Sequence, residues 1–266
     1  MFDQFNRRIN YLRISVTDRC NLRCTYCMPE EGIVQIPHSH ILSFEEIIEV
    51  TRVAVRNGFE KVRITGGEPL VRKGIVELVR MLTSIEGITD FGLTTNGTLL
   101  KQFAYPLYQA GLKRINVSLD TLNPDRYKSI TRVGSLSDVL EGLEEAKRVG
   151  FNPIKLNCVV EKDSNEPDAR AVKAFAQANG YIARFIPKMN LDEGIFGVVE
   201  GGEGGNCSTC NRLRLTADGI LKPCLFSDSG YNVRELGIEK AIEMAIKNKP
   251  ICGMANRTGE FYNIGG

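Results

Sequence analysis

Apolar and polar residues alternate in two rhythms from residue 11 to residue 188. Short β-branched runs, in which roughly every second residue is apolar, are separated by longer stretches with apolar residues at helical spacing. The short runs predict strands at residues 11–17, 61–65, 91–95, 114–119, 154–160 and 181–187. The longer stretches predict helices at residues 43–57, 72–84, 99–110, 135–149 and 166–179. Repeated strand–helix units with short connections indicate an α/β fold with a parallel sheet and right-handed crossovers.

Four of these strands carry a polar stripe on one face. Asn116, Ser118 and Asp120 share one side of the strand at 114–119 and of the turn that follows it. On the other three strands, polar residues likewise alternate with apolar ones and so share one face. They are Arg13, Ser15, Thr17, Lys61, Arg63, Thr65, Lys155 and Asn157. Buried parallel strands are normally apolar on both faces, and a closed eight-stranded barrel fills its interior with branched apolar side chains. We therefore expect an open partial (β/α)6 barrel, TIM-like in its build, with a polar interior.

The strand–helix rhythm stops after residue 188. Residues 190–206 are rich in glycine and predict a flexible connection, and residues 207–266 are too short and irregular for an independent domain. We expect a barrel over residues 1–189, and a glycine-rich link with a C-terminal region that caps the barrel mouth over 190–266.

Composition narrows the classes of protein. The formal charge is +2, from 34 basic and 32 acidic residues, so no global field attracts nucleic acid or anionic lipid. No apolar run reaches membrane-spanning length, and the residues after Met1 do not resemble a secretory signal. We expect a cytoplasmic protein whose eight cysteines are reduced thiols.

Three cysteines, Cys20, Cys24 and Cys27, follow the first predicted strand with the spacing C-x3-C-x2-C. Three thiolates on one loop can bind a [4Fe-4S] cluster and leave its fourth iron open to a substrate. A disulfide and a zinc site are the alternatives. Zinc usually takes four ligands as two spaced pairs, which this loop does not offer.

A second set of three cysteines, Cys207, Cys210 and Cys224, lies near the other end. Cys252 can complete a zinc ribbon, which keeps that alternative open. The strand-like segment after Cys210 places Arg212 and Arg214 on one face.

Seven cations are candidates for binding an anion in the barrel, and they are Arg13, Lys61, Arg63, Lys155, Arg184, Arg212 and Arg214. Buried charges are costly unless paired, and a triphosphate would neutralise them. Ion pairing with acids on adjacent strands is the alternative, although these strand faces carry few acids.

The first cysteine loop resembles that of the radical S-adenosylmethionine (SAM) enzymes, and the Thr65–Pro69 segment resembles their motif for the SAM amino group. The resemblance implies that the open iron chelates the methionine end of SAM, and that a cluster electron cleaves SAM to a 5′-deoxyadenosyl radical. Tyr26 resembles the aromatic residue beside adenine. The SAM-binding candidates are Tyr26, Gly66, Gly67, Glu68, Thr94, Ser118 and Met189.

Residues 7–189 and 205–266 resemble the GTP 3′,8-cyclase family within the radical SAM superfamily, on the segments Cys207–Arg214, Cys224 and the final Gly265-Gly266. The resemblance implies two [4Fe-4S] clusters, SAM, and a lyase that converts GTP to 3′,8-cyclo-7,8-dihydro-GTP in molybdenum cofactor biosynthesis. The second cluster would bind guanine, and the seven cations would bind the triphosphate. The catalytic candidates are Asp120, Lys155, Asn157, Gly265 and Gly266. A low-potential electron donor such as flavodoxin or ferredoxin, and a homodimer, are the implied partners.

The chain departs from this family at 189–206, where relatives carry a considerably longer segment. A paralogue acting on another nucleotide therefore stays open. A radical SAM peptide-modifying enzyme and a zinc-dependent binding module are two further alternatives. Cys252, His38 and His40 have no assigned role.

Overall fold

A curved, open sheet forms the centre of the molecule in a computed structural model that describes residues 1–190, 193–194 and 196–253. Its nine strands have the order β6-β5-β4-β3-β2-β1-β7-β8-β9, so β6 and β9 are edges. All pairs from β6 to β7 are parallel. The six strands of the barrel proper are β1 (Tyr11–Ser15), β2 (Lys61–Thr65), β3 (Asp90–Thr95), β4 (Ile115–Ser118), β5 (Ile154–Val160) and β6 (Ile182–Pro187).

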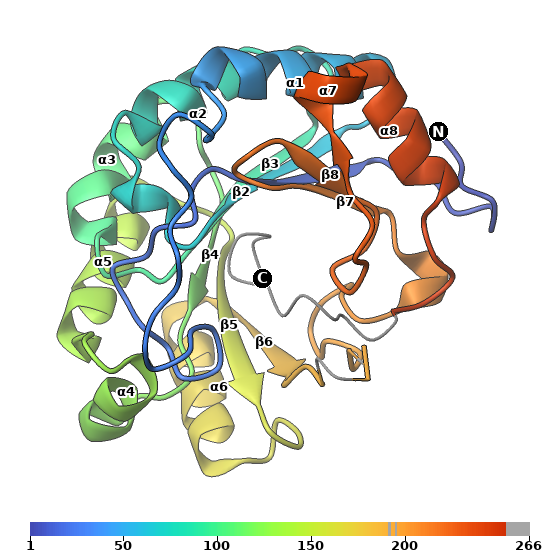
Figure 1. The fold of residues 1–266 in the computed structure, drawn as a ribbon. Helices are drawn as coiled ribbons and strands as arrows, with labels where there is room; N and C mark the ends of the chain where they lie inside the picture. Colours follow the sequence, from blue (N-terminus) through green and yellow to red (C-terminus); the bar gives the residue numbers. More distant parts are fainter. Residues whose placement is uncertain (191–192, 195, 254–266) are drawn as a thin grey trace.

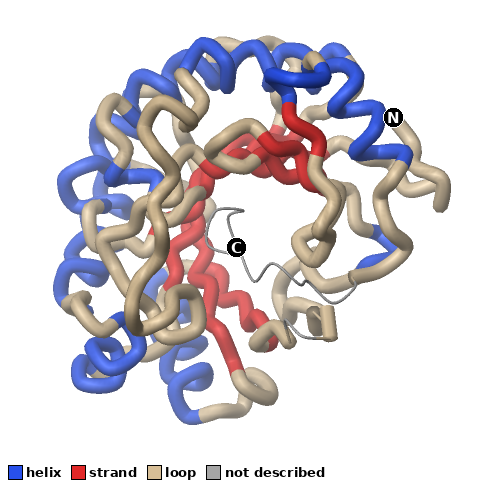
Figure 2. Tube along the Cα trace, viewed as in Figure 1, coloured by secondary structure: helices blue, strands red, loops and turns tan. Residues whose placement is uncertain are grey.

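Helices cover the outer side of this sheet, and the strands line the inside of the curve (Figures 1 and 2). Ser43 caps the first helix in a capping box with Glu46, as its sequence pattern indicates. The barrel helices are α1 (Phe44–Arg56), α2 (Ile75–Thr83), α3 (Leu100–Gln109), α4 (Pro124–Thr131), α5 (Leu136–Val149) and α6 (Pro167–Asn179), with a short 3₁₀ helix η1 (Pro69–Val71) before α2.

The prediction of an open partial barrel is confirmed. All six expected strands form, and the apolar faces are buried against the helices: Ile14, Ile64, Ile115 and Leu156 are in the core. The opposite faces carry the polar stripe inward, away from the helices of the described residues.

Helix α4 is not among the helices that the sequence predicts. The Asn123 side chain accepts a hydrogen bond from the backbone of Arg126, and Pro124 occupies the first turn, where proline is tolerated. The helix has eight residues and mostly polar ones, so it lacks the apolar periodicity that identifies longer helices.

The described part of the C-terminal region joins the barrel sheet. Strand β7 (Arg212–Leu215) pairs in parallel with β1, and β8 (Ile220–Lys222) and β9 (Tyr231–Asn232) continue the sheet in antiparallel fashion. Helices α7 (Val233–Leu236) and α8 (Ile238–Lys247) follow, and α8 packs against α1. The C-terminal region therefore extends the sheet beyond β1, with α8 beside α1 on the outer side (Figure 1).

The glycine-rich link makes contact with the other edge of the sheet. Phe185 in β6 and Glu200 exchange backbone hydrogen bonds of 3.0 Å in an antiparallel bridge. Gly201, with φ +75°, lies so close to the Ala183 carbonyl that a Cβ there would be 2.7 Å from the oxygen. The link thus covers part of the edge that an open barrel leaves unpaired.

None of the helices in the described residues is both long and apolar enough to cross a membrane.

Candidate active site

The first cysteine set lies on the loop that leaves β1, at the carboxyl end of the parallel strands. Cys20 and Cys24 are half-buried and Cys27 is exposed. Asn96, from the loop after β3, donates from Nδ2 to Cys20 Sγ at 3.8 Å and to Asn21 Oδ1 at 2.9 Å. Asn96 is a site residue that the sequence prediction missed.

The three thiols lie close enough to affect one another. Burial, then the Cys20 thiolate and Asp120, raises the pKa of Cys24 to about 12. The neighbouring thiolates of Cys24 and Cys20 also act to raise the pKa of Cys27, after burial. With pKa values this high the thiols keep their protons unless a positive partner compensates the thiolates, and the irons of a cluster are such a partner.

The Gly66-Gly67 turn packs directly on the backbone that leads into the cysteine loop. A Cβ on Gly67 would be 2.4 Å from the Arg19 carbonyl oxygen, and one on Gly66 would be 2.8 Å from that of Thr17. Gly67 N donates to Thr17 O and Glu68 N to Arg19 O, both at 2.8 Å. These glycines are required for a close approach between two chain segments, and they hold the cysteine loop in place.

The Glu68 carboxylate points into the protein. It is 1 % exposed and accepts from Leu70 N at 3.0 Å, Thr95 Oγ1 at 2.8 Å and Asn96 N at 2.7 Å. Burial raises its pKa to about 7, against these hydrogen bonds. Glu68 therefore joins the turn after β2 to the loop after β3, which also carries Asn96.

Tyr26 and Asp120 are joined across the mouth of the barrel. Tyr26 Oη donates to Asp120 Oδ2 at 2.7 Å, and the Val159 amide donates to Asp120 Oδ1 at 2.8 Å. Asp120 thereby fixes the ring of Tyr26 relative to β5.

The other SAM candidates divide into two groups. Thr94 and Ser118 face the barrel interior at the ends of β3 and β4, and Thr94 Oγ1 is buried without a hydrogen-bond partner among the described residues. Met189 instead packs against the small cluster of Leu225 and Phe226, against which Cys224 of the second cysteine set also packs.

The cations form rows across neighbouring strands. Arg13 in β1 is paired in register with Arg63 in β2 and with Arg214 in β7. On the other side of the barrel, Lys155 is next to Asn116, and Arg184 is next to Asn157. Adjacent strands are only about 4.8 Å apart, so like charges in one row repel each other.

Burial and repulsion between the cations both lower the pKa values of these side chains. Burial, then Arg214, lowers the pKa of Arg13 to about 9, and burial, then Arg184, lowers that of Lys155 to about 8. Burial would raise the pKa of Tyr11, but Arg13, Arg63 and Arg212 outweigh it and lower the value to about 8. The interior therefore attracts anions.

Ion pairing within the described residues does not account for five of the seven cations. Among the described residues, no carboxylate forms an ion pair with Lys61, Arg63, Lys155, Arg184 or Arg212. Several buried polar atoms also have no partner in the described part of the chain, and they include Arg63 Nη1, Asn116 Oδ1, Asn157 Oδ1 and Arg184 Nε.

Arg114 and Gly92 belong to the same interior and are absent from the predicted site. Arg114 pairs with Asp90, and it has the parity of Asn116, which is a usable signal in the sequence. Gly92 leaves room for Arg63, since a Cβ on it would be 2.9 Å from Arg63 Nη1.

The second cysteine set faces these cations. Burial acts to raise the pKa of Cys210, but Lys249 and Arg212 outweigh it and lower the value. Burial raises the pKa of Cys224, although Lys249 acts against it. No sequence signal identifies Lys249, because it lies 25 residues beyond Cys224 with no motif around it.

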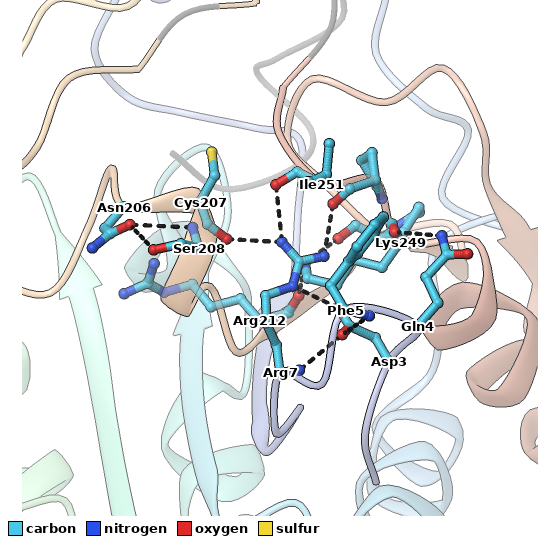
Figure 3. A network of polar contacts seen from close by, with 12 residues as sticks. Asp3, Gln4, Phe5, Arg7, Asn206, Cys207, Ser208, Arg212, Lys249 and Ile251 are labelled. Atoms are coloured by element: carbon cyan, nitrogen blue, oxygen red, sulfur yellow. Dashed lines mark hydrogen bonds and ion pairs between the residues drawn. The ribbon is translucent and has the colours of Figure 1, made fainter.

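Residues of the N-terminal segment also reach this set (Figure 3). Arg7 Nη1 donates to the Cys207 carbonyl at 2.8 Å, and Arg7 Nε forms an ion pair with Asp3 at 2.6 Å. The candidate catalytic residues Gly265 and Gly266 lie outside the described residues.

The donor sets fit iron–sulfur clusters better than single ions. Among the described residues, no three or more His, Cys, Asp or Glu side chains stand in the geometry of a bound metal ion. The assignment of clusters rests on two sets of three cysteines, the mutual influence of Cys20, Cys24 and Cys27, and the charge on Lys249 beside Cys210 and Cys224.

Two family models match the chain. The model of the radical SAM superfamily matches residues 14–176, and the model described as "Molybdenum Cofactor Synthesis C" matches residues 165–260. The first runs from the end of β1 into α6, and the second runs from the start of α6 through α8 and includes the second cysteine set.

Curated relatives match most of the chain. The chain is 44% identical over 282 residues to a GTP 3′,8-cyclase of Thermodesulfovibrio yellowstonii, covering 89% of this chain and 88% of the relative. It is 45% identical over 270 residues to a GTP 3′,8-cyclase of Alkaliphilus metalliredigens, covering 86% and 84%. Both alignments are longer than the 266 residues of this chain, so both relatives contain positions that it lacks.

Solved structures share the fold. SuiB of Streptococcus suis bound to S-adenosylmethionine matches with a TM-score of 0.68 at 17% identity, over 92% of this chain and 66% of that one. Methylornithine synthase matches with a TM-score of 0.57 at 16% identity, over 94% and 76%.

Proposed function

Since the chain belongs to the GTP 3′,8-cyclase family of the radical SAM superfamily, we propose that it converts GTP to 3′,8-cyclo-7,8-dihydro-GTP, the first step of molybdenum cofactor biosynthesis. The observation that carries the choice of substrate is a set of inward cations, among them Arg63 and Arg184, that form no ion pair with a carboxylate of the described residues. A triphosphate would neutralise them.

Cys20, Cys24 and Cys27 would hold the first [4Fe-4S] cluster, and Cys207, Cys210 and Cys224 the second. When bound, the reduced first cluster supplies the electron that cleaves SAM to methionine and a 5′-deoxyadenosyl radical. The chain's own residues orient the reactants.

SAM would lie over the carboxyl ends of β2, β3 and β4. Tyr26, fixed by Asp120, is placed to lie beside the adenine. The backbone of Gly66 and Gly67 would receive the amino group, since the Glu68 side chain is engaged by Thr95 and Asn96. Thr94 and Ser118 offer hydroxyls to the carboxylate and ribose. Met189 packs against the same Leu225 and Phe226 cluster as Cys224, from where it would reach only the part of SAM nearest the second set.

GTP would bind between the two cysteine sets. Arg13, Arg63 and Arg214 form one wall for the triphosphate, and Lys61, Lys155, Arg184 and Arg212 complete it. Lys155 and Asn157 on β5, together with Asp120, would orient the ribose or the purine. Gly265 and Gly266 would complete the site, on the family resemblance alone.

The domain division, the electron donor and the assembly are proposed from the family resemblance. We assign residues 1–189 to the radical SAM barrel and 190–266 to the link and second-cluster region. A low-potential donor such as flavodoxin or ferredoxin would reduce the first cluster, and a cytoplasmic homodimer is the expected assembly.

The test is an anaerobic assay of cluster-reconstituted protein with SAM, dithionite and GTP. Mass spectrometry follows 5′-deoxyadenosine and products derived from GTP. We expect GTP-dependent 5′-deoxyadenosine and a product isomeric with GTP. Formation of 5′-deoxyadenosine that ignores GTP would keep the radical chemistry and exclude this substrate, and other nucleotides and peptides would then be screened.

A further inference from the structure

A buried lysine lies between two of the three cysteine-bearing segments of the second set. Lys249 is 2 % exposed, and its Nζ donates to the carbonyl of Arg212 at 2.8 Å and to that of Pro223 at 2.6 Å. Arg212 follows Cys210 by two residues, and Pro223 directly precedes Cys224. The ammonium therefore joins the segments that carry these two cysteines.

The third segment is attached to the same network (Figure 3). Arg7 donates to the Cys207 carbonyl at 2.8 Å, and to the carbonyls of Pro250 and Ile251 at 2.7 and 3.1 Å. Gln4 Nε2 donates to the Lys249 carbonyl at 3.3 Å. All three cysteine segments are thus connected through Arg7 and Lys249.

The charge of Lys249 has no carboxylate partner among the described residues. An unpaired buried ammonium is costly, and two carbonyl oxygens satisfy its hydrogen bonds without neutralising it. The neighbouring groups that can carry a compensating charge are Cys210 and Cys224, whose thiolate forms interact electrostatically with the ammonium. A cluster held by three thiolates keeps that negative charge in place.

We propose that Lys249 is the positioning residue of the second cluster, holding the Cys210 and Cys224 segments together and raising the reduction potential of the cluster by its positive charge. The inference rests on the proposed function to the extent that a second cluster is present. Reduction adds one negative charge to a cluster, so a nearby fixed cation favours the reduced form.

The experiment separates the two roles with Lys249→Gln, Lys249→Met and Lys249→Arg in the full chain, with Lys247→Gln as the control on the exposed side of α8. Each is made in a parent whose Cys20, Cys24 and Cys27 are replaced by Ala, so that all iron belongs to the second set. Iron and sulfide per chain, the midpoint potential from an EPR-monitored titration, and the melting temperature without iron are measured.

We expect Lys249→Met to lose most of the iron and to melt at a lower temperature even without iron, because two buried carbonyls lose their donor. Lys249→Gln keeps a donor but not the charge, so it retains iron at a lower potential. Lys249→Arg restores the potential, and Lys247→Gln matches the parent in every measurement.

Three results would overturn the inference in whole or in part. Iron content and potential equal to the parent in both Lys249→Gln and Lys249→Met would show that Lys249 has no role toward the cluster. If Lys249→Gln had the same midpoint potential as the parent while Lys249→Met still lost its iron, the role of the positive charge would be overturned. A parent that binds no iron would instead refute the second cluster of the proposed function, and this inference with it.

Discussion

The two cysteine sets lie in opposite electrostatic surroundings. Around the first, burial raises the Cys24 pKa, and the Cys20 thiolate and the Asp120 carboxylate add to the rise. Around the second, burial acts in the same direction on Cys210, but Lys249, Arg212 and Arg214 outweigh it and lower the pKa. The same kind of ligand set is therefore placed once among anions and once among cations.

The difference matches two chemical tasks. Anionic surroundings disfavour the addition of an electron, so a cluster there is a strong reductant once reduced, as SAM cleavage requires. Under the proposed function, the cationic surroundings would attract the triphosphate and hold it beside the second set. The proposed function would thus separate electron delivery from substrate binding by the sign of the local charge.

The largest expected effect comes from removing one ligand on each side. Cys24→Ser should abolish SAM cleavage, whereas Cys224→Ser should retain 5′-deoxyadenosine formation and lose the GTP-derived product. Each variant should keep about half of the wild-type iron, if the two sets bind clusters of equal size. Anaerobic mass spectrometry and iron analysis check this, and equal loss of SAM cleavage in both variants would contradict the division of tasks.

Arg63→Met tests the cationic side directly. Arg63 is 3 % exposed, and a triphosphate would be its charge partner. Loss of a buried charge partner costs roughly 2–5 kcal/mol, which is about 30-fold or more in the dissociation constant for GTP. Calorimetric titration measures the affinity, with exposed Arg80→Met as the control.

The ligand-free protein should respond to Arg63→Met in the opposite way. Because Arg63 stands beside Arg13 in register, its removal relieves repulsion and should leave the melting temperature unchanged or higher. A lower melting temperature with unchanged GTP affinity would instead support a structural role for the cation.

Gly92→Ala should weaken GTP binding less, by about tenfold, or about 1.4 kcal/mol. The added Cβ would lie 2.9 Å from Arg63 Nη1 and displace the guanidinium. A double-mutant cycle checks the cause, because the same alanine should cost little in the Arg63→Met background. Additive losses would show that Gly92 acts elsewhere.

The smallest effect is a tyrosine titration specific to the cationic side. The pKa of Tyr11 is lowered to about 8 in the folded chain from an ordinary value of 10.0, because the neighbouring arginines outweigh burial. An acidic group whose pKa is lowered on folding adds to the folding stability. For Tyr11 this contribution is fully present above about pH 10 and is lost as the pH falls through about 8. Ultraviolet absorbance should show one tyrosine ionising near pH 8, moving upward with GTP and disappearing in Tyr11→Phe. If GTP did not change the pKa of Tyr11, the triphosphate would bind away from Arg13, Arg63 and Arg212.

Local patterns are enough to predict the barrel. The strands predicted at 61–65 and 154–160 match the structure to the residue, because each is short, β-branched and bounded by turn signals. Alternation along the strands is also sufficient to predict that Arg13 and Arg63 face the interior. Both features depend only on residues close together in the sequence.

Long-range contacts cannot be predicted in this way. Arg7 reaches the carbonyls of Cys207 and Pro250, more than 190 residues away, and no spacing in the sequence indicates these bonds. The same applies to Glu68, whose carboxylate binds Thr95 and Asn96 although its motif suggests a ligand contact. Arg114 is different, since its parity with Asn116 is enough to identify it.

The pairing of β7 with β1 has a consequence for how the protein is made. Residues 11–14 emerge early during translation, but their partners at 212–215 are synthesised only after the whole barrel. Until then β1 keeps an open edge, which invites pairing with other chains. Lys249 is synthesised later still. The second cysteine set therefore cannot take its final geometry before Lys249 has been added to the chain. The second set can therefore be completed only after the first set and the barrel around it have been synthesised.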